Sequence, residues 1–241
     1  MHVARDLPEG REHLDDETAK LEVRSGGSVI IERAAQQATF FLSRRPTPSA
    51  LLHPHLAQVA AVASHWRGRI AFHAGAFAAG GGVWGLLGEK GSGKSSALAV
   101  LAARGIPIVC DDVLVLAGGT AFAGPRSIDL RTDAAHVLGK GEPLGVIGDR
   151  ERWRMALGEI EPELPFRGWV TLRWADAVTV RPLQGSRRLR ELLGHLALRV
   201  PPVTPTDLIE YAAHPFLELS RPRDWSSIED ALERLLAAVS G

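Results

Sequence analysis

The sequence predicts an α/β fold: a mixed β-sheet core with flanking helices, followed by a C-terminal helical segment. Three observations lead to this prediction. A glycine-rich loop at 88–95 stands between an apolar strand and a helix. Alternating apolar residues before and after it predict further strands. The last third of the chain carries apolar residues at helical spacing, for example over 187–198 and 226–239.

The loop matches G-x-x-x-x-G-K-[ST], the phosphate-binding P-loop. The short apolar run Val83–Leu87 precedes it, and the helical run Ser96–Arg104 follows and ends at Gly105. In such a loop the backbone N–H groups point at phosphate oxygens, Lys94 reaches the β- and γ-phosphates, and the Ser95 hydroxyl sits on Mg²⁺. The alternative is an ordinary glycine-rich turn. The predicted nucleotide-binding residues are Gly88, Glu89, Lys90, Gly91, Ser92, Gly93, Lys94, Ser95 and Ser96.

Residues 1–66 are expected to form a β-hairpin and helix segment that packs on the core. The alternating stretches Leu21–Arg24 and Val29–Arg33 flank two glycines, which predicts a hairpin. Ala38–Leu42 predicts a third strand, and the apolar spacing over His55–Trp66 predicts an amphipathic helix.

Residues 67–183 are expected to form the core around the P-loop. Arg69–Ala79 predicts a strand that turns at the triple glycine of 80–82 and pairs with the strand entering the loop. A turn centred near Gly81 places His73 opposite a residue near Glu89, beside the mouth of the loop. The alternative for a single strand histidine is a hydrogen-bonded core residue.

Two adjacent carboxylates, Asp111 and Asp112, interrupt the apolar run Ile106–Leu116. Burying an unpaired carboxylate is costly, so a cation, a metal or hydrogen-bond donors must offset it, and a nucleotide-bound Mg²⁺ near Lys94 would do so. The alternative is a strand end or tight turn where both meet water. The four apolar residues that follow favour a continuing strand. Because adjacent strand residues point to opposite faces, the two aspartates have different roles, and the sequence leaves open which one faces the phosphate.

The remaining core contains further candidate residues. Two short strands are predicted over Thr120–Arg131, ending with Asp129 and Arg131, both candidate phosphate or acceptor contacts. The alternation of residues over 150–154 puts three arginines on one face of a strand. They either form a solvated edge or bind an anion, as a clamp over the nucleotide or the acceptor. Those three are Arg150, Arg152 and Arg154. Residues 184–241 are expected to be helical, with helices over 187–198, Thr206–Leu219 and 226–239.

Composition sets limits on function and setting. The formal net charge is zero, which gives no general attraction to nucleic acid or to an anionic membrane. No apolar run approaches the roughly 20 residues that span a bilayer, and the charged N-terminus lacks the apolar region of a signal peptide. The single cysteine, Cys110, excludes an internal disulfide, and a reducing cytoplasm is the expected setting. The histidines show no metal-ligand spacing, so no zinc site is expected.

The combination of His73, the P-loop and Asp111-Asp112 resembles the catalytic domain of HPr kinase/phosphorylase over about residues 69–116. In that family a histidine on the preceding strand, the loop and an Asp-Asp pair on the next strand form the site. His73–Ala76 and Leu101–Gly105 are similar to the compact bacterial HPr-kinase-like proteins, some of which phosphorylate a serine of a ribosomally made peptide such as a lasso precursor. The family's Glu-x-Arg-Gly signature corresponds here to 129–131 without its glycine, so the resemblance does not extend to the phosphorylase reaction or to HPr as acceptor.

The resemblance implies an HPr-kinase-like, phosphoenolpyruvate-carboxykinase-like fold and an ATP- and Mg²⁺-dependent kinase, with another nucleoside triphosphate open as the donor. It implies that Asp111 is the base for an acceptor hydroxyl, that Asp112 and Ser95 support the metal, and that His73 orients the base or touches the γ-phosphate. The expected acceptor is a serine or threonine hydroxyl of a peptide or protein, and a homo-oligomer is one expectation because HPr kinases form hexamers. Two alternatives stay open: a kinase of small hydroxylated molecules, and a nucleotide-binding regulatory module without catalysis.

Overall fold

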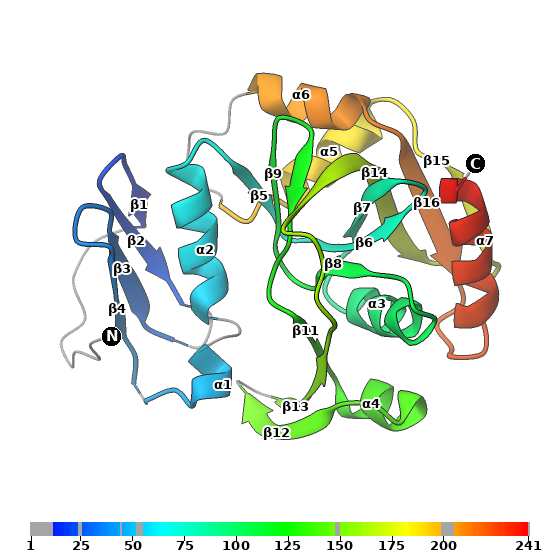
Figure 1. Cartoon of the computed structure of the whole chain (residues 1–241), viewed down its shortest axis with the longest axis horizontal. Coiled ribbons are helices and arrows are strands. Elements are labelled where there is room, and N and C mark those ends of the chain that lie inside the picture. Colours follow the sequence, from blue (N-terminus) through cyan, green and yellow to red (C-terminus); the bar gives the residue numbers. More distant parts are fainter. Residues whose placement is uncertain are drawn as a thin grey trace.

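The computed structural model describes residues 12–23, 26–43, 45–51, 55–147, 150–198 and 205–240. Within them the chain forms an α/β fold of three sheets with flanking helices (Figure 1). A small N-terminal sheet lies at one end, the largest sheet forms the centre, and a third sheet lies beside the P-loop helix.

The N-terminal sheet is antiparallel in the order β1-β2-β3-β4, which confirms the predicted hairpin and third strand. Apolar residues of β3, including Val29 and Ile31, pack with Ala61 and Val62 of the predicted helix. Ala71 of the core belongs to the same cluster, so this segment packs on the core. The elements are β1 (His13–Leu14), β2 (Thr18–Glu22), β3 (Ser28–Glu32), β4 (Gln37–Phe41), α1 (Pro48–Ala50) and α2 (Leu56–His65).

The central sheet runs β5-β9-β10-β14-β7-β6-β8, with β16 beside β14 and β15 beside β16. β7, β14 and β16 are parallel, and β6 is antiparallel to both β7 and β8, so β8 runs in the same direction as β7. The carboxyl ends of these four strands therefore meet at one edge, where α/β sheets bind ligands. The strands are β5 (Ile70–Phe72), β6 (Gly75–Ala79), β7 (Gly82–Leu87), β8 (Ile108–Cys110), β9 (Leu114–Ala117), β10 (Thr120–Phe122), β14 (Glu163–Trp174), β15 (Thr179–Pro182) and β16 (Phe216–Arg221).

Helices cover both faces of this sheet (Figure 1). On one face α3 (Lys94–Ala103) and α7 (Ile228–Ser240) pack against Leu86 and its neighbours. On the other face α5 (Ser186–Gly194) and α6 (Pro205–Ala213) pack around Leu87 and Trp169. Consecutive residues of β7 thus enter different cores, as the period of two requires, and β7 is buried along its whole length.

The third sheet has the order β11-β13-β12. Ile128 and Leu130 of β11 are buried in the same core as α3, so this sheet packs against that helix. The elements are β11 (Ser127–Leu130), α4 (Thr132–Leu138), β12 (Glu142–Ile147) and β13 (Arg150–Ala156).

Two predicted strands are each broken in two, and in both cases the candidate site residues stand at the break. The strand predicted over 69–79 ends at Phe72 as β5 and restarts at Gly75 as β6. The prediction of one strand continuing through 106–116 is wrong, because β8 ends at Cys110 and β9 begins at Leu114. The breaks allow each half to pair with a different neighbour: β5 with β9, and β6 with both β7 and β8.

The helix predicted over 206–219 is wrong beyond Ala213, where β16 takes its place. Pro215 explains the change, because proline lacks an N–H donor and disfavours helical backbone in the residue before it. The Pro215 carbonyl instead accepts a hydrogen bond from the Trp169 amide at 2.9 Å, which leads the chain into its pairing with β14. The predicted helical segment therefore also contributes a strand to the central sheet.

Candidate functional site

The P-loop connects β7 to α3, in the strand, loop and helix order that the sequence predicts. Gly91 and Gly93 have φ angles of 91° and 90°, in the left-handed region that side chains other than glycine rarely adopt. Gly93 is the N-cap of α3, so the first amides of the helix open toward the loop. The loop therefore turns sharply through its glycines into the N-terminus of α3.

Lys94 is folded against the loop. Its Nζ donates to the Gly88 carbonyl at 2.5 Å and approaches the Glu89 carbonyl at 3.4 Å. Burial lowers the pKa of the Lys94 ammonium, while Asp112 and Asp111 act in the opposite direction. A cation held between the loop and two carboxylates is well placed to meet the terminal phosphates of a nucleotide.

Asp111 lies directly after β8 and faces the start of α3. Burial, followed by the charge of Asp112, raises the pKa of the Asp111 carboxyl from 3.8 to about 7, although the Ser95 hydroxyl and the Asp129 amide lower it. The Asp129 N–H donates to Oδ2 at 3.2 Å. Among the described residues, Asp111 Oδ1 and the Ser92 hydroxyl are buried without a hydrogen-bond partner. Unpaired buried oxygens of this kind need a ligand, and carboxylate and hydroxyl oxygens are the donors that Mg²⁺ prefers.

The raised pKa of Asp111 makes stability depend on pH in the metal-free protein. Between about pH 4 and pH 7 the folded state binds a proton that the unfolded state has lost, so the free energy of unfolding falls as the pH rises. Asp111→Asn removes this titration and is expected to raise the unfolding free energy at about pH 8 by a few kcal/mol at most, with the gain vanishing near pH 4. Urea denaturation in EDTA at both pH values measures this difference. An Asp111→Asn protein less stable than wild type at pH 8 would contradict it.

Asp112 points to the other side of the break and contacts His73. His73 Nδ1 lies 3.2 Å from Asp112 Oδ1, and both side chains are about one-third exposed. The ladder of β6 and β7 pairs Gly75 with Leu86, so His73 lies two residues outside the paired strand, near the level of Gly88. The predicted place of His73, beside the loop mouth, agrees with this register.

Sequence reasoning missed His195, at the end of α5. Its Nδ1 donates to the Glu191 carbonyl at 2.7 Å, so its Nε2 is free to accept the Gly88 N–H at 3.2 Å. The His195 carbonyl accepts the His73 N–H at 2.6 Å. One residue thus links the first glycine of the loop to the histidine on the neighbouring segment. No local motif marks it, because it stands 107 residues from Gly88.

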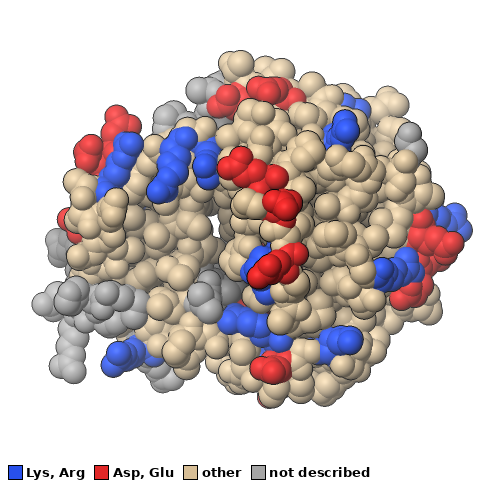
Figure 2. Space-filling model, viewed as in Figure 1, with Lys and Arg blue, Asp and Glu red and all other residues tan. Residues whose placement is uncertain are grey.

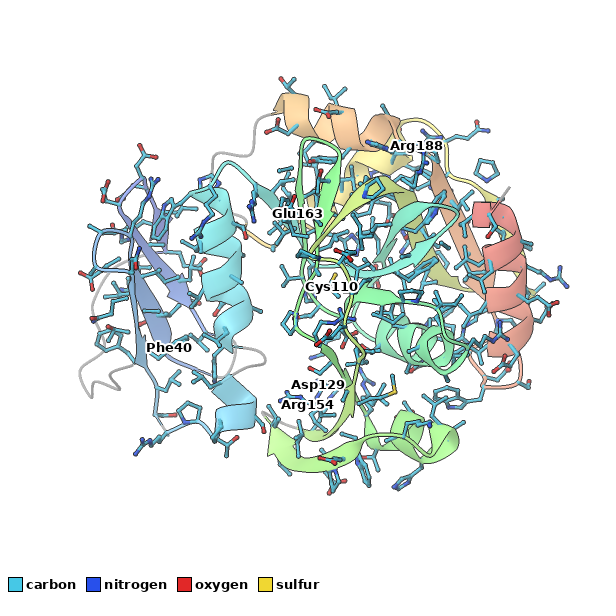
Figure 3. All side chains as sticks on the ribbon, viewed as in Figure 1. Phe40, Cys110, Asp129, Arg154, Glu163 and Arg188 are labelled. Atoms are coloured by element: carbon cyan, nitrogen blue, oxygen red, sulfur yellow. The ribbon has the colours of Figure 1, made fainter. Side chains whose placement is uncertain are left out.

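Asp129 and Arg154 form an ion pair behind Asp111 (Figure 3). The Arg154 guanidinium donates to both Asp129 oxygens, at 2.7 and 2.8 Å, and the Asp129 side chain is 6% exposed. Because the Asp129 amide also donates to Asp111, the ion pair helps to hold the Asp111 carboxylate in place.

Arg154→Met is expected to destabilise the protein by about 2–3 kcal/mol, because it leaves the buried Asp129 carboxylate without its guanidinium. Urea denaturation measures the change. Arg152→Met is the matched control, since it removes an arginine from the same strand face and is expected to change stability by less than about 0.5 kcal/mol. Equal losses in the two variants would contradict the role given to the ion pair.

Arg131 lies beside the loop, and Arg150 and Arg152 lie near Arg131. The Arg131 guanidinium lies 3.8 Å from where a Cβ on Gly91 would stand. Burial lowers the pKa of Arg131, and the charges of Arg150 and Arg152 lower it further, so the three guanidinium groups lie within electrostatic reach of one another. Like charges brought together beside a phosphate loop favour a bound anion.

Ser96, the last of the predicted binding residues, lies in the first turn of α3.

Elsewhere the charged side chains are mixed in sign. In Figure 2 both acidic and basic groups are present over the visible described surface, in keeping with the zero net charge. Among the described residues, no helix combines the length and apolar character needed to cross a membrane.

The sequence matches no model of a protein family and no curated protein. Among solved structures, the HPr(Ser) kinase/phosphatase from Coxiella burnetii is similar at 11% identity and a TM-score of 0.34, over 70% of this chain and 88% of that one. An agreement this loose assigns neither an activity nor a substrate.

Proposed function

We propose that the chain is an ATP- and Mg²⁺-dependent phosphotransferase that phosphorylates a hydroxyl group on a peptide or protein. The observation that carries the proposal is that the two adjacent aspartates beside the loop have different interaction partners. Asp111 interacts with the P-loop serine Ser95, and Asp112 contacts His73. Nucleotide binding alone has no use for a second carboxylate with its own histidine, whereas transfer to a hydroxyl requires an acceptor for the proton.

The site residues fit a magnesium ion. The Ser95 hydroxyl and the Asp111 carboxylate are hard oxygen donors next to the phosphate loop, and Asp111 Oδ1 lacks a partner among the described residues. Serine and a carboxylate from a neighbouring strand are the residues that hold this ion in P-loop proteins. When bound, Mg²⁺ neutralises charge on the phosphate oxygens.

The remaining chemistry belongs to the protein. Lys94 and the loop amides hold the β- and γ-phosphates in line with the acceptor. Asp112, held by His73, takes the proton of the acceptor hydroxyl as its oxygen bonds to the γ-phosphorus. The bond from phosphorus to the β–γ bridging oxygen breaks, and the nucleoside diphosphate leaves with that electron pair. These neighbours favour metal support by Asp111 and the base role for Asp112, the reverse of the roles implied by the resemblance.

The test is transfer from γ-labelled ATP with Mg²⁺ to a panel of serine- and threonine-containing peptides, including ribosomally made precursors, and to a panel of hydroxylated metabolites. Mass spectrometry then identifies the phosphorylated product. A phosphopeptide supports the proposal, and a phosphorylated metabolite shows a small-molecule kinase instead. Tight ATP binding with no product from any acceptor favours a regulatory nucleotide-binding module.

A further inference from the structure

A nucleotide on this loop has a defined direction. Asp111 follows β8, which lies on one side of β7, while β14 and β16 lie on the other side. If the terminal phosphate faces Asp111 and Lys94, the nucleoside extends away from β8, toward the carboxyl ends of β14 and β16. This inference rests on the proposed function only in requiring that the loop bind a nucleotide.

An aromatic side chain stands at that place. Trp174 is the last residue of β14, its neighbour Leu172 is buried against α3, and Trp174 itself is 36% exposed. Its ring carbon Cη2 lies 3.3 Å from where a Cβ on Gly93 would stand. A large, partly exposed indole therefore borders the loop on the side toward which the nucleoside would extend.

Two arginines lie close to the ring. Arg221 ends β16 and pairs with Trp174 in the sheet register. Its guanidinium carbon lies 4.5 Å from the ring centroid, and that of Arg223 lies 6.0 Å away. Arg221 Nη1 donates to the carbonyls of Pro222 and Asp224, at 3.1 and 2.7 Å, so its position does not depend on the indole. Holding Arg221 in place is therefore not enough to explain why a partly exposed tryptophan stands at this position.

We propose that Trp174 is the stacking platform for the nucleobase of the bound nucleotide, with Arg221 fixing the orientation of the indole. Stacking between a base and an aromatic side chain is favourable for every base, because each has a π-face. The platform therefore supplies affinity for a nucleoside over a bare polyphosphate while discriminating little among bases.

The experiment compares two ligands by titration calorimetry in Mg²⁺: ATP, and inorganic tripolyphosphate as a probe without a base. Trp174→Ala is expected to weaken ATP binding roughly tenfold, within the range that loss of one stacked base gives. The affinity of Trp174→Ala for tripolyphosphate is expected to stay within about twofold of wild type. An unchanged tripolyphosphate affinity also shows that the loop of the variant is intact. Trp174→Phe keeps an aromatic face and is expected to retain most of the ATP affinity.

The outcomes separate this inference from the proposed function. Unchanged ATP affinity in Trp174→Ala, or an equal loss for both ligands, overturns the platform, the second result showing that the ring only supports the loop. A wild-type protein that binds tripolyphosphate as tightly as ATP also overturns it while leaving the phosphate loop intact. Binding of neither ligand by the wild-type protein removes both the platform and the proposed kinase.

Discussion

Asp111→Asn is expected to lower phosphotransfer by about 10³-fold. The physical reason is that Asp111 Oδ1 is a buried oxygen without a partner among the described residues, next to the Ser95 hydroxyl. An amide in its place keeps the shape but removes the negative charge that a divalent cation requires. Initial rates of transfer over a Mg²⁺ titration measure the effect, and the variant is expected to need far more Mg²⁺ than wild type.

Asp112→Asn is the matched control, because it changes the adjacent residue by the same chemistry. It is expected to reduce transfer strongly while leaving the Mg²⁺ dependence of ATP binding near that of wild type, since Asp112 contacts His73. Normal Mg²⁺ dependence in Asp111→Asn, together with lost transfer, would instead make Asp111 the base. Full transfer by Asp111→Asn would exclude both roles.

Lys94→Met is expected to weaken ATP binding roughly 10- to 100-fold and to abolish measurable transfer, because the charge-assisted hydrogen bonds to phosphate are lost. The Lys94 ammonium is half-buried against the loop and close to both aspartates, so no other lysine of the loop can replace it. Titration calorimetry with ATP gives the affinity, and the transfer assay gives the rate.

Lys90→Met is the control for that prediction. Lys90 belongs to the same loop and carries the same charge, but its side chain is exposed. Its removal is expected to change ATP affinity by less than about threefold, since exposed charge contacts contribute little. Equal losses in the two variants would mean that the loop attracts phosphate by overall charge rather than by the position of Lys94.

Local sequence patterns determined the glycine-rich loop, the strand before it and the helix after it. The spacing of the glycines, the apolar run to Leu87 and the helical run from Lys94 act over a few residues, and the structure has these elements where they were predicted. The turn at 80–82 likewise places His73 near the loop, because a hairpin fixes its own register. Asp111 and Asp112 also stand out locally, as charges in an apolar run.

Only the tertiary structure decided which partner each of the two aspartates contacts. The chain leaves the sheet between β8 and β9, at the two aspartates, because β8 pairs with β6 and β9 pairs with β5. As a result Asp111 interacts with Ser95, and Asp112 contacts His73. His195 and Trp174 reach the loop from elements about 80 to 110 residues away, through packing that no local pattern encodes. Strand β16 forms for the same reason: after Pro215 ends the helix, pairing with β14 satisfies its backbone and brings Arg221 beside Trp174.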